Sequence, residues 1–184
     1  MRVTFEELMR DYLALRGESP DLLPRLTDGE DVSAVLTLSR ELMAKLPSAA
    51  VKATLGTPLI FIDEVKETQP EMTLDSRGCI QVRLPDDYLR LYSLRMQDWR
   101  EPVREPERSD SLRWRLGGNA PEWMCCTEHP MVVEDRDAAG MMLCVYGSEA
   151  YDMPATLLYV PFPSFDGNVL TISRASYRRI FDEL

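Results

Sequence analysis

The stretch LPDDYLRLYSLRMQDW, residues 84–99, constrains the fold most, because its composition requires a change of backbone direction. Pro85 has no backbone N–H to donate, so it cannot continue the alternating run that ends at Leu84. Asp86 and Asp87 follow, and short carboxylates are favoured beside the exposed N–H groups of a turn or helix start. We therefore expect a one-turn elbow over residues 85–89 and then a strand to Trp99. The helical alternative stays open, because four residues also fit one helical face: Tyr88, Leu91, Tyr92 and Arg95.

The residues before the elbow have mainly helical periodicity. Thr4 and Glu7 have the spacing of a capping box, and Gly17 is a suitable stop for the helix that follows. Residues 17–30 hold two prolines and two glycines, which predicts a loop. A second helix is expected from Asp31 or Ser33 to about Leu46 and a third from Ser48 to Leu55, because Pro47 separates them. The apolar face of the second helix would consist of Val32, Val35, Leu36, Leu42, Met43 and Leu46.

The residues after position 57 read mostly as short strands separated by turns. Turn residues are placed at 75–78, 137–140 and 166–168. The expected strands are Leu59–Ile62, Cys79–Leu84, Trp123–Thr127, Pro130–Glu134, Met141–Tyr146 and Ala155–Pro161. Their spacing suits an antiparallel meander, which Pro161-Phe162-Pro163 interrupts, and residues 173–181 predict a C-terminal helix with Tyr177, Ile180 and Phe181 buried. The prediction is a single α+β domain, residues 1–184, with a helical lobe at 1–56 packed on a mainly β half at 57–184.

The charge and the apolar runs of the chain argue against two classes of partner, nucleic acids and membranes. The net charge of −10 opposes non-specific nucleic-acid binding, which depends on cations that displace counterions at phosphates. No apolar run approaches the roughly 20 residues of a membrane span. Glu6, Glu7 and Asp11 lie where a signal peptide needs an apolar core, so we expect a cytoplasmic protein.

The residues that could perform chemistry lack the spacing that such chemistry needs. Cys125, Cys126 and His129 form C-C-x-x-H, but adjacent cysteines rarely point at one metal ion and no CxxC exists. Asp86 and Asp87 are better explained by turn chemistry than by acid–base catalysis or magnesium binding. Phosphate-binding loops are absent as well. We therefore expect no catalytic residue, metal or cofactor, and reduced thiols at all four cysteines.

Residues 100–122 are rich in charge, proline and glycine, which predicts a long excursion, with a short helix from Ser109 to Leu116 as an option. Arginine and tryptophan gather on it, and these residues are enriched at the energetic centres of protein interfaces. Trp99 and Trp114 fit core packing equally well, and Trp123 fits it better. The excursion lies between acidic flanks, so an acidic surface of a neighbour is a suitable partner. The predicted partner-binding residues are Trp99, Arg100, Arg104, Arg108, Trp114 and Arg115.

Two motifs suggest a family. The octet Leu84–Leu91 resembles the LPxDxxRL-like elbow of bacteriophage head–tail adaptor and tail tubular proteins, and Tyr159-Val160-Pro161-Phe162-Pro163 is similar to a later segment that closes their β half. The resemblance spans residues 30–184 in outline. It implies a non-enzymatic structural protein that binds copies of itself and neighbouring ring or portal proteins and forms a ring on assembly. A phage-derived gene would make the protein a virion component.

A second hypothesis comes from a different class of protein. A small-ligand binding domain, or an enzyme of another type, would use an apolar pocket between helices and sheet with convergent polar groups such as Asp87, Tyr88 and His129.

Overall fold

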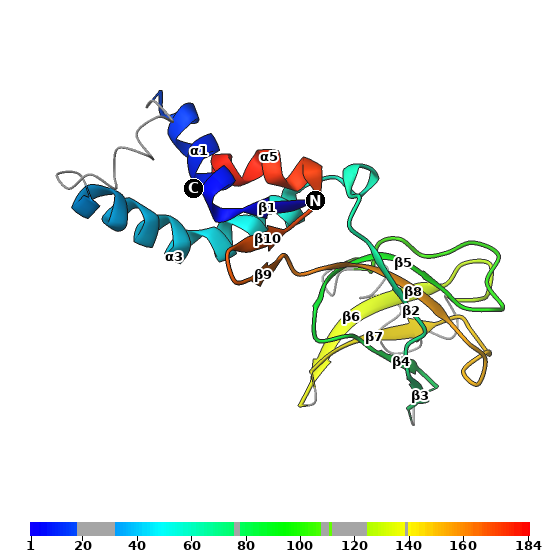
Figure 1. Ribbon diagram of the computed structural model, residues 1–184. Helices are drawn as coiled ribbons and strands as arrows, with labels where there is room; N and C mark the ends of the chain where they lie inside the picture. Colours follow the sequence, from blue (N-terminus) through cyan, green and yellow to red (C-terminus); the bar gives the residue numbers. More distant parts are fainter. Residues whose placement is uncertain (18–31, 76–77, 108–110, 112–124, 139) are drawn as a thin grey trace. The chain divides into compact units, whose positions relative to one another are not determined.

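The computed structural model describes residues 1–17, 32–75, 78–107, 111, 125–138 and 140–184, with side chains from residue 37 onward in the helix that begins at Val32. The chain forms two compact units (Figure 1). Met1–Glu64 and Phe162–Leu184 make the first, called the helical unit, and Val65–Pro161 make the second, called the β unit. The expected division at residue 56 therefore misses the return of the last segment to the helical unit.

The first helix begins where its capping residues predict. Strand β1 (Arg2–Thr4) leads into helix α1 (Phe5–Leu15), and Thr4 and Glu7 make the full capping box. The Glu7 backbone N–H donates to Thr4 Oγ1 at 3.2 Å, and the Thr4 N–H donates to Glu7 Oε2 at 2.8 Å. Gly17 has φ of +72° beyond the end of the helix, as expected of a glycine stop.

Helix α3 (Val32–Gly56) corrects the prediction of two helices, because it continues through Pro47. Its buried stripe keeps helical spacing across the proline and consists of Leu42, Leu46, Ala49, Ala50 and Ala53. Pro47 lies on the exposed face, where the loss of one hydrogen bond is least disruptive to packing. Tertiary burial thus outweighs the local preference for a break. Of the predicted apolar face, Leu42 and Leu46 are buried, Met43 is partly exposed, and the side chains of Val32, Val35 and Leu36 lie outside the described residues.

The end of the chain completes the helical unit. Strands β9 (Ser164–Asp166) and β10 (Val169–Thr171) form a hairpin at Gly167, and β10 also pairs with β1 to give the sheet β1-β10-β9. Helix α5 (Arg174–Glu183), capped by Ser173, packs on α3 and confirms the predicted C-terminal helix. Tyr177 and Ile180 are buried, whereas Phe181 is only partly so.

The apolar run Leu59–Ile62 is not a strand. It forms a 3₁₀ turn, η1 (Leu59–Phe61), whose Phe61 N–H donates to Pro58 O at 3.0 Å. Ile62 is buried, but Ile60 is 79% exposed and Phe61 is 60% exposed. The sequence pattern fails here because Pro58 and the acidic residues after Ile62 leave too short a run for pairing with another strand.

The β unit consists of two antiparallel sheets that share one core. The first sheet has the order β2-β8-β5, made of Lys66–Thr68, Thr156–Pro161 and Tyr88–Arg95. The second has the order β3-β4-β7-β6, made of Met72–Leu74, Ile80–Arg83, Gly140–Tyr146 and Met131–Asp137. Large side chains of both sheets meet between them, among them Val82, Leu91, Leu94, Leu143 and Leu157.

The strands pair differently from the predicted meander. Strand β8 inserts between β2 and β5 rather than beside β7, so distant segments pair. The β6–β7 hairpin, with Asp137 opposite Gly140, is correctly placed by the predicted turn. The predicted strand Trp123–Thr127 is wrong for its described part, because the His129 N–H donates to Cys126 O at 2.9 Å and closes a turn there.

The elbow is confirmed as a turn followed by a strand. The Tyr88 N–H donates to Pro85 O at 3.0 Å across Asp86 and Asp87, and β5 begins at Tyr88. The strand ends at Arg95 rather than Trp99. Together these elements confirm the α+β fold class. Among the described residues, no helix combines the length and apolar character that a bilayer crossing requires.

Candidate interaction surface

Trp99 anchors the start of the predicted arginine-rich excursion. Its side chain is 2% exposed within the shared core of the β unit, and its indole Nε1–H donates to Gly147 O at 3.0 Å. A buried side chain offers no area to a partner, so Trp99 does not belong to the contact surface that the sequence suggested. Its role is to fix the start of residues 100–122 in the core of the β unit.

Asp98, the residue before Trp99, holds the same turn through two hydrogen bonds. One carboxylate oxygen accepts from the Ser148 hydroxyl at 2.8 Å, and the other accepts from the Glu149 backbone N–H at 2.9 Å. Hydrogen bonds to a charged acceptor are the stronger kind. The turn that carries Asp98 and Trp99 is therefore held on the segment after β7.

The other end of the excursion meets the same segment. Gly147 has φ of +83°, and a Cβ built on it would lie 2.7 Å from the carbonyl oxygen of Cys126. Only glycine permits this approach of two backbones. Trp99, just before residues 100–122, and Cys126, after them, thus both contact one residue, Gly147.

Residues 100–107 follow the β unit rather than leaving it at once. Val103 and Leu94 exchange two backbone hydrogen bonds of 2.7 and 2.9 Å, and the Glu107 N–H donates to Val132 O at 2.6 Å. Arg100 and Arg104 are exposed, as an interface role requires.

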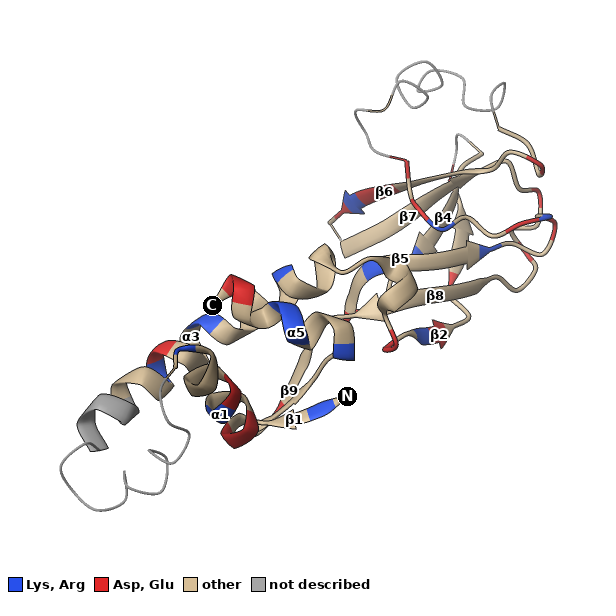
Figure 2. Cartoon of the chain, turned by 90° about the horizontal axis from the view of Figure 1, so that it is seen from above, with Lys and Arg blue, Asp and Glu red and all other residues tan. Residues whose placement is uncertain are grey.

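The charge of this described part is mixed, because exposed glutamates at positions 101 and 105 alternate with Arg100 and Arg104. Acidic and basic residues are also interspersed over the strands and loops of the β unit in Figure 2. The remaining predicted contacts, Arg108, Trp114 and Arg115, lie outside the described residues, as do Trp123 and nearly all of the optional helix from Ser109 to Leu116. The expected cationic character of the surface is not apparent in residues 100–107.

The elbow carries a polar network instead of an open site. Asp87 accepts hydrogen bonds from the Tyr159 hydroxyl, at 2.8 Å, and from the Lys66 ammonium. Burial raises the pKa of Asp87, but the two donors outweigh it and hold the pKa below its usual value. Burial and then the Asp87 carboxylate raise the pKa of Tyr159 to about 12.

Tyr88 makes a similar hydrogen bond to a carboxylate. Its hydroxyl donates to Glu134 Oε1 at 2.7 Å, and its ring lies 6.0 Å from the ring of Tyr159. Burial, followed by the bond to Glu134, raises the pKa of Tyr88 above that of a free tyrosine. Both tyrosines therefore keep their protons and serve as donors inside the fold, and Asp87 is already satisfied.

The C-C-x-x-H motif does not assemble a metal site in the described structure. Cys126 and His129 are exposed, and Cys125 is partly buried beside the sheet β3-β4-β7-β6. Among the described residues, no three His, Cys, Asp or Glu side chains are grouped so as to hold a metal ion.

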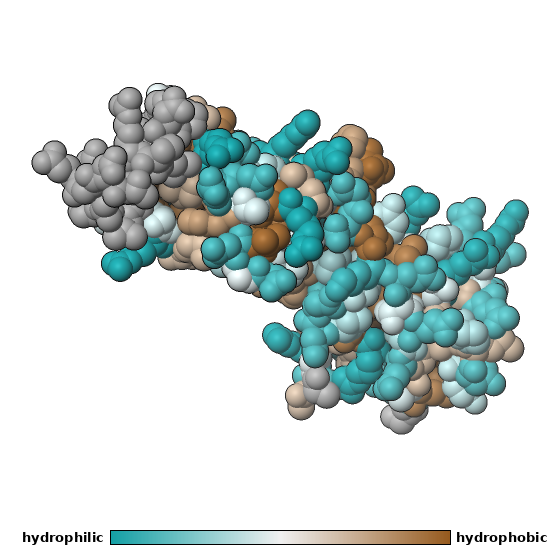
Figure 3. All heavy atoms as spheres, viewed as in Figure 1, coloured by the Kyte–Doolittle hydropathy of each residue, from teal (hydrophilic) through white to brown (hydrophobic). Residues whose placement is uncertain are grey.

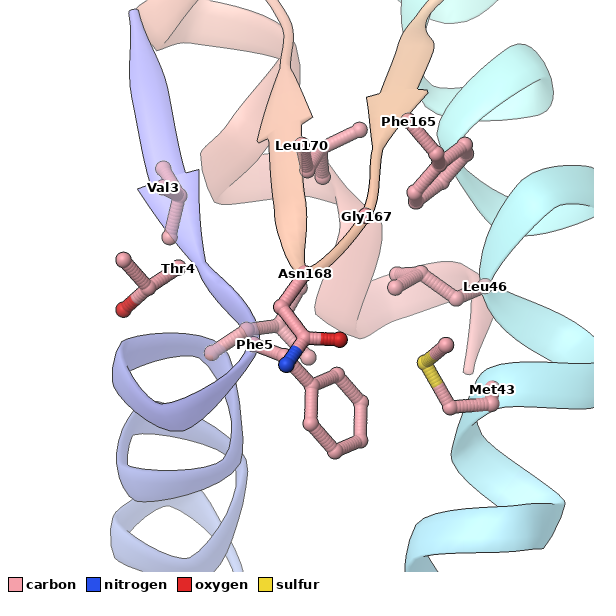
Figure 4. A pocket seen from close by; sticks show the side chains of 10 residues that line it. Val3, Thr4, Phe5, Met43, Leu46, Phe165, Gly167, Asn168 and Leu170 are labelled. Atoms are coloured by element: carbon pink, nitrogen blue, oxygen red, sulfur yellow. The ribbon is translucent and has the colours of Figure 1, made fainter.

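Two depressions lie between helices and sheet in the helical unit, where a ligand pocket was the alternative prediction. The first is an apolar slot of about 10 Å³ between α1, α3 and the β9–β10 hairpin, with Phe5, Met43 and Phe165 around it (Figure 4). This volume holds about one water molecule and is far below the roughly 300 Å³ of a small ligand pocket.

The second depression is open and measures about 310 Å³. The ionisable groups that line it already have partners: the Tyr177 hydroxyl donates to Asp11 at 2.6 Å, and Arg10 pairs with Glu6. Burial and then Asp11 raise the pKa of Tyr177 above its ordinary value. Asp87, Tyr88 and His129, the polar groups named for the ligand hypothesis, line neither depression.

Sequence reasoning missed the exposed pair Ile60–Phe61, which it assigned to a strand. The signal was present, because Pro58 precedes the pair and Asp63 and Glu64 follow it, and so short a run has little room to enter a sheet. It also missed Lys66 as the partner of Asp87, for which no local signal exists. No protein-family model matches the chain, and no curated protein matches it.

Proposed function

We propose that this chain is a non-enzymatic structural protein that binds neighbouring protein subunits, of the kind found at the head–tail joint of tailed bacteriophages. The observation that carries the interaction role is the exposure of two consecutive large apolar side chains, Ile60 and Phe61, on η1. The elbow octet and the Tyr159–Pro163 segment support the phage assignment.

The turn that presents Ile60 and Phe61 is fixed on both sides. Before it, the Thr57 hydroxyl donates to Ala53 O at 2.7 Å and accepts from the Ser176 hydroxyl at 3.1 Å. After it, Ile62 is buried, and Asp63 Oδ1 accepts a hydrogen bond from the Arg174 backbone N–H at 3.1 Å. A contact surface held in place loses little conformational freedom on binding, which favours affinity.

Exposed apolar area of this kind has a clear driving force for association. Burying an isoleucine or phenylalanine side chain is worth roughly 1.5–3 kcal/mol each. Large apolar side chains reach the surface among hydrophilic ones on the face shown in Figure 3. Arg100 and Arg104 belong to the proposal as charged contacts that add orientation and salt dependence rather than most of the affinity.

The test uses the gene neighbourhood and a binding measurement. Portal, capsid and terminase genes are expected beside this gene, and genes of an unrelated metabolic pathway there would contradict the phage assignment. The purified protein should co-sediment with the neighbouring portal or ring protein. The double variant Ile60→Ser/Phe61→Ser should lower that affinity at least tenfold, which corresponds to ~1.4 kcal/mol.

Leu15→Ser is the matched control, since Leu15 is 66% exposed on α1 and its replacement removes apolar area elsewhere on the helical unit. Equal binding by the wild type and the double variant would remove Ile60 and Phe61 from the interface. Stabilisation of the protein by a metabolite or metal in a thermal-shift panel, without binding to any ring protein, would favour the ligand-binding alternative.

A further inference from the structure

Helix α5 brings arginines beside the exposed apolar pair Ile60–Phe61. The Arg174 backbone N–H donates to Asp63 Oδ1 at 3.1 Å, so the first turn of α5 lies against the end of the segment that carries the pair. The Arg179 guanidinium lies against Gly56, where an added Cβ would meet Nη2 at 3.2 Å, so the second turn lies against the start of that segment. Basic residues on α5 are visible in Figure 2. We call the following set the basic patch: Ile60, Phe61, Arg174, Arg178 and Arg179.

The arginines of the basic patch are open to a partner. All three side chains are exposed, and none of them forms a salt bridge within the described part of the chain. Arg174 and Arg178 are one helical turn apart and therefore share one side of α5. The segments that meet here, residues 56–63 and 173–180, hold three arginines against one carboxylate, Asp63. The charge around Ile60 and Phe61 is therefore mainly positive.

A second exposed surface, on the β unit, has the opposite charge. The loop between β7 and β8 presents Tyr151 at 49% and Met153 at 45% exposure, and Glu149 and Asp152 are exposed on the same loop. Neither carboxylate forms a salt bridge among the residues that the structure describes. Residues 147–155 hold no lysine or arginine. We call Glu149, Tyr151, Asp152 and Met153 the acidic patch.

Hydrogen bonds hold the acidic patch on the β unit. Besides the bond from Glu149 to Asp98, the Ala150 N–H donates to Ser148 Oγ at 3.2 Å, and the Met153 N–H donates to Ala150 O at 3.2 Å and closes a turn. Ala150 is buried and anchors this turn. A surface held in this way loses little conformational freedom on binding. Tyrosine, methionine and arginine, which the two patches present, are all enriched at protein interfaces.

We propose that the basic patch of one copy of this chain docks on the acidic patch of a second copy. Each patch combines two large, exposed apolar or aromatic side chains with charges of mainly one sign, and the two signs are opposite. The contact buries these side chains together and places the arginines against carboxylates, which fixes the orientation of the two copies. Because the two patches differ, each copy keeps one patch for a further neighbour, as in a head-to-tail assembly. The inference rests on the proposed function, since it names a partner for Ile60 and Phe61.

Paired charge reversals test this contact on the full chain. Arg174→Glu/Arg178→Glu reverses the basic patch, and Glu149→Arg/Asp152→Arg reverses the acidic patch. In sedimentation experiments, each variant alone should self-associate about tenfold or more weakly than the wild type, because like charges then face each other. An equimolar mixture of the two variants should regain the association of the wild type, because every reversed patch finds a complementary patch on the other variant. This recovery also shows that both variants are folded.

Arg40→Glu/Arg136→Glu is the matched control, because it changes the net charge by the same amount at two exposed positions outside the patches. It should associate like the wild type. Association of the wild type should also weaken as salt rises from about 50 to about 500 mM, since exposed charges are screened. A mixture that associates no better than the separate variants would overturn the proposal.

Three results separate this proposal from its alternatives. A wild type that stays monomeric at every concentration, yet binds a portal or ring protein through Ile60 and Phe61, would overturn the second copy as partner and leave the proposed function standing. Recovery in the mixture, with unrelated metabolic genes beside this gene, would support the contact without the phage assignment. Binding to phosphatidylserine vesicles that Arg174→Glu/Arg178→Glu abolishes, without self-association, would assign the basic patch to an anionic lipid surface and overturn the proposal.

Discussion

Gly147→Ala is the sharpest test of how the two ends of the excursion are held. The new Cβ would lie 2.7 Å from Cys126 O, 2.9 Å from Cys126 N and 3.0 Å from Cys126 C. All three are backbone atoms, so no side-chain rotation relieves the overlap. The residue also has φ of +83°, which a residue with a Cβ adopts at a cost of ~1–2 kcal/mol.

The expected loss follows from two terms. The strain at positive φ costs ~1–2 kcal/mol, and forcing an extra carbon into a packed site costs ~1–3 kcal/mol. Together they give a loss of about 2–5 kcal/mol in the free energy of unfolding of the β unit. Gly78→Ala is a matched control, because Gly78 has φ of +77° in the same unit but no atom within 4 Å of an added Cβ. It should show the first term alone.

Urea denaturation followed by tryptophan fluorescence measures both variants, since Trp99 lies in the core of the β unit and the sequence has no tryptophan outside residues 65–161. The positive-φ strain is common to both variants, so only the overlap of ~1–3 kcal/mol separates them. With a urea dependence of ~1–3 kcal/mol per molar, Gly147→Ala should lower the midpoint by about 1 M relative to Gly78→Ala. Equal midpoints for the two variants would mean that Cys126 does not press on Gly147. The conclusion that Cys126 lies in close backbone contact with Gly147 would then be refuted.

Three further outcomes are expected. Pro47→Ala should stabilise the helical unit by ~1–3 kcal/mol, because it restores a backbone hydrogen bond that proline lacks. Far-ultraviolet circular dichroism during thermal unfolding measures the change. A destabilised variant would show that the proline ring is needed for packing. Tyr159→Phe should remove a contribution to stability that depends on alkaline pH. The folded state holds the Tyr159 phenol proton to about pH 12, so this contribution is full below pH 10 and is lost as the pH rises from 10 to 12. An unchanged alkaline unfolding profile would contradict the hydrogen bond to Asp87. Thr4→Ala should raise the lowered pKa of Glu7 only part of the way in an NMR titration, because alanine keeps the backbone N–H that chiefly lowers this pKa and loses the hydroxyl that also lowers it. A Glu7 pKa unchanged from the wild type would exclude the bond from the Thr4 hydroxyl. In the wild type, the lowered Glu7 pKa stabilises the fold above the ordinary carboxyl pKa, and this is lost as the pH falls through the lowered value.

Features set by neighbouring residues could be predicted from the sequence. The capping box at Thr4, the helix stop at Gly17 and the turn at Gly167 each depend on a few adjacent residues whose backbone preferences agree. The elbow belongs to the same class, since Pro85 and two aspartates favour a turn wherever they occur. These predictions are confirmed because the tertiary structure does not oppose them.

Features set by distant contacts could not be predicted. Pro47 predicts a helix end, yet a continuous buried stripe on both sides of it keeps α3 in one piece. The insertion of β8 between β2 and β5 depends on pairing across long separations that no periodicity records. Within β5, register shifts between Tyr88 and Arg90 and between Leu91 and Ser93 disrupt the alternation that the sequence suggested.

The candidate interaction surface also has some features that neighbouring residues set and others that distant contacts set. The gathering of arginine and tryptophan located the excursion, but residue type alone could not separate Trp99, which is buried as an anchor, from Arg100 and Arg104, which are exposed. Tryptophan suits an interface and a core for the same reason, its large apolar area. Trp99 is distinguished as a core residue by the hydrogen bond from its indole Nε1–H to the carbonyl oxygen of Gly147, a residue that is distant in sequence.

The division of the chain into units also bears on how the proposed contact surface is held. Ile60 and Phe61 lie near the end of the first segment of the helical unit, yet the residues that fix their turn come from the last segment. Ser176 donates to Thr57, and the Arg174 backbone donates to Asp63. A change in α5 that touches neither apolar side chain should therefore weaken partner binding by loosening the turn. The surface is thus a property of the completed chain, because its apolar residues and their supports are separated by the whole β unit.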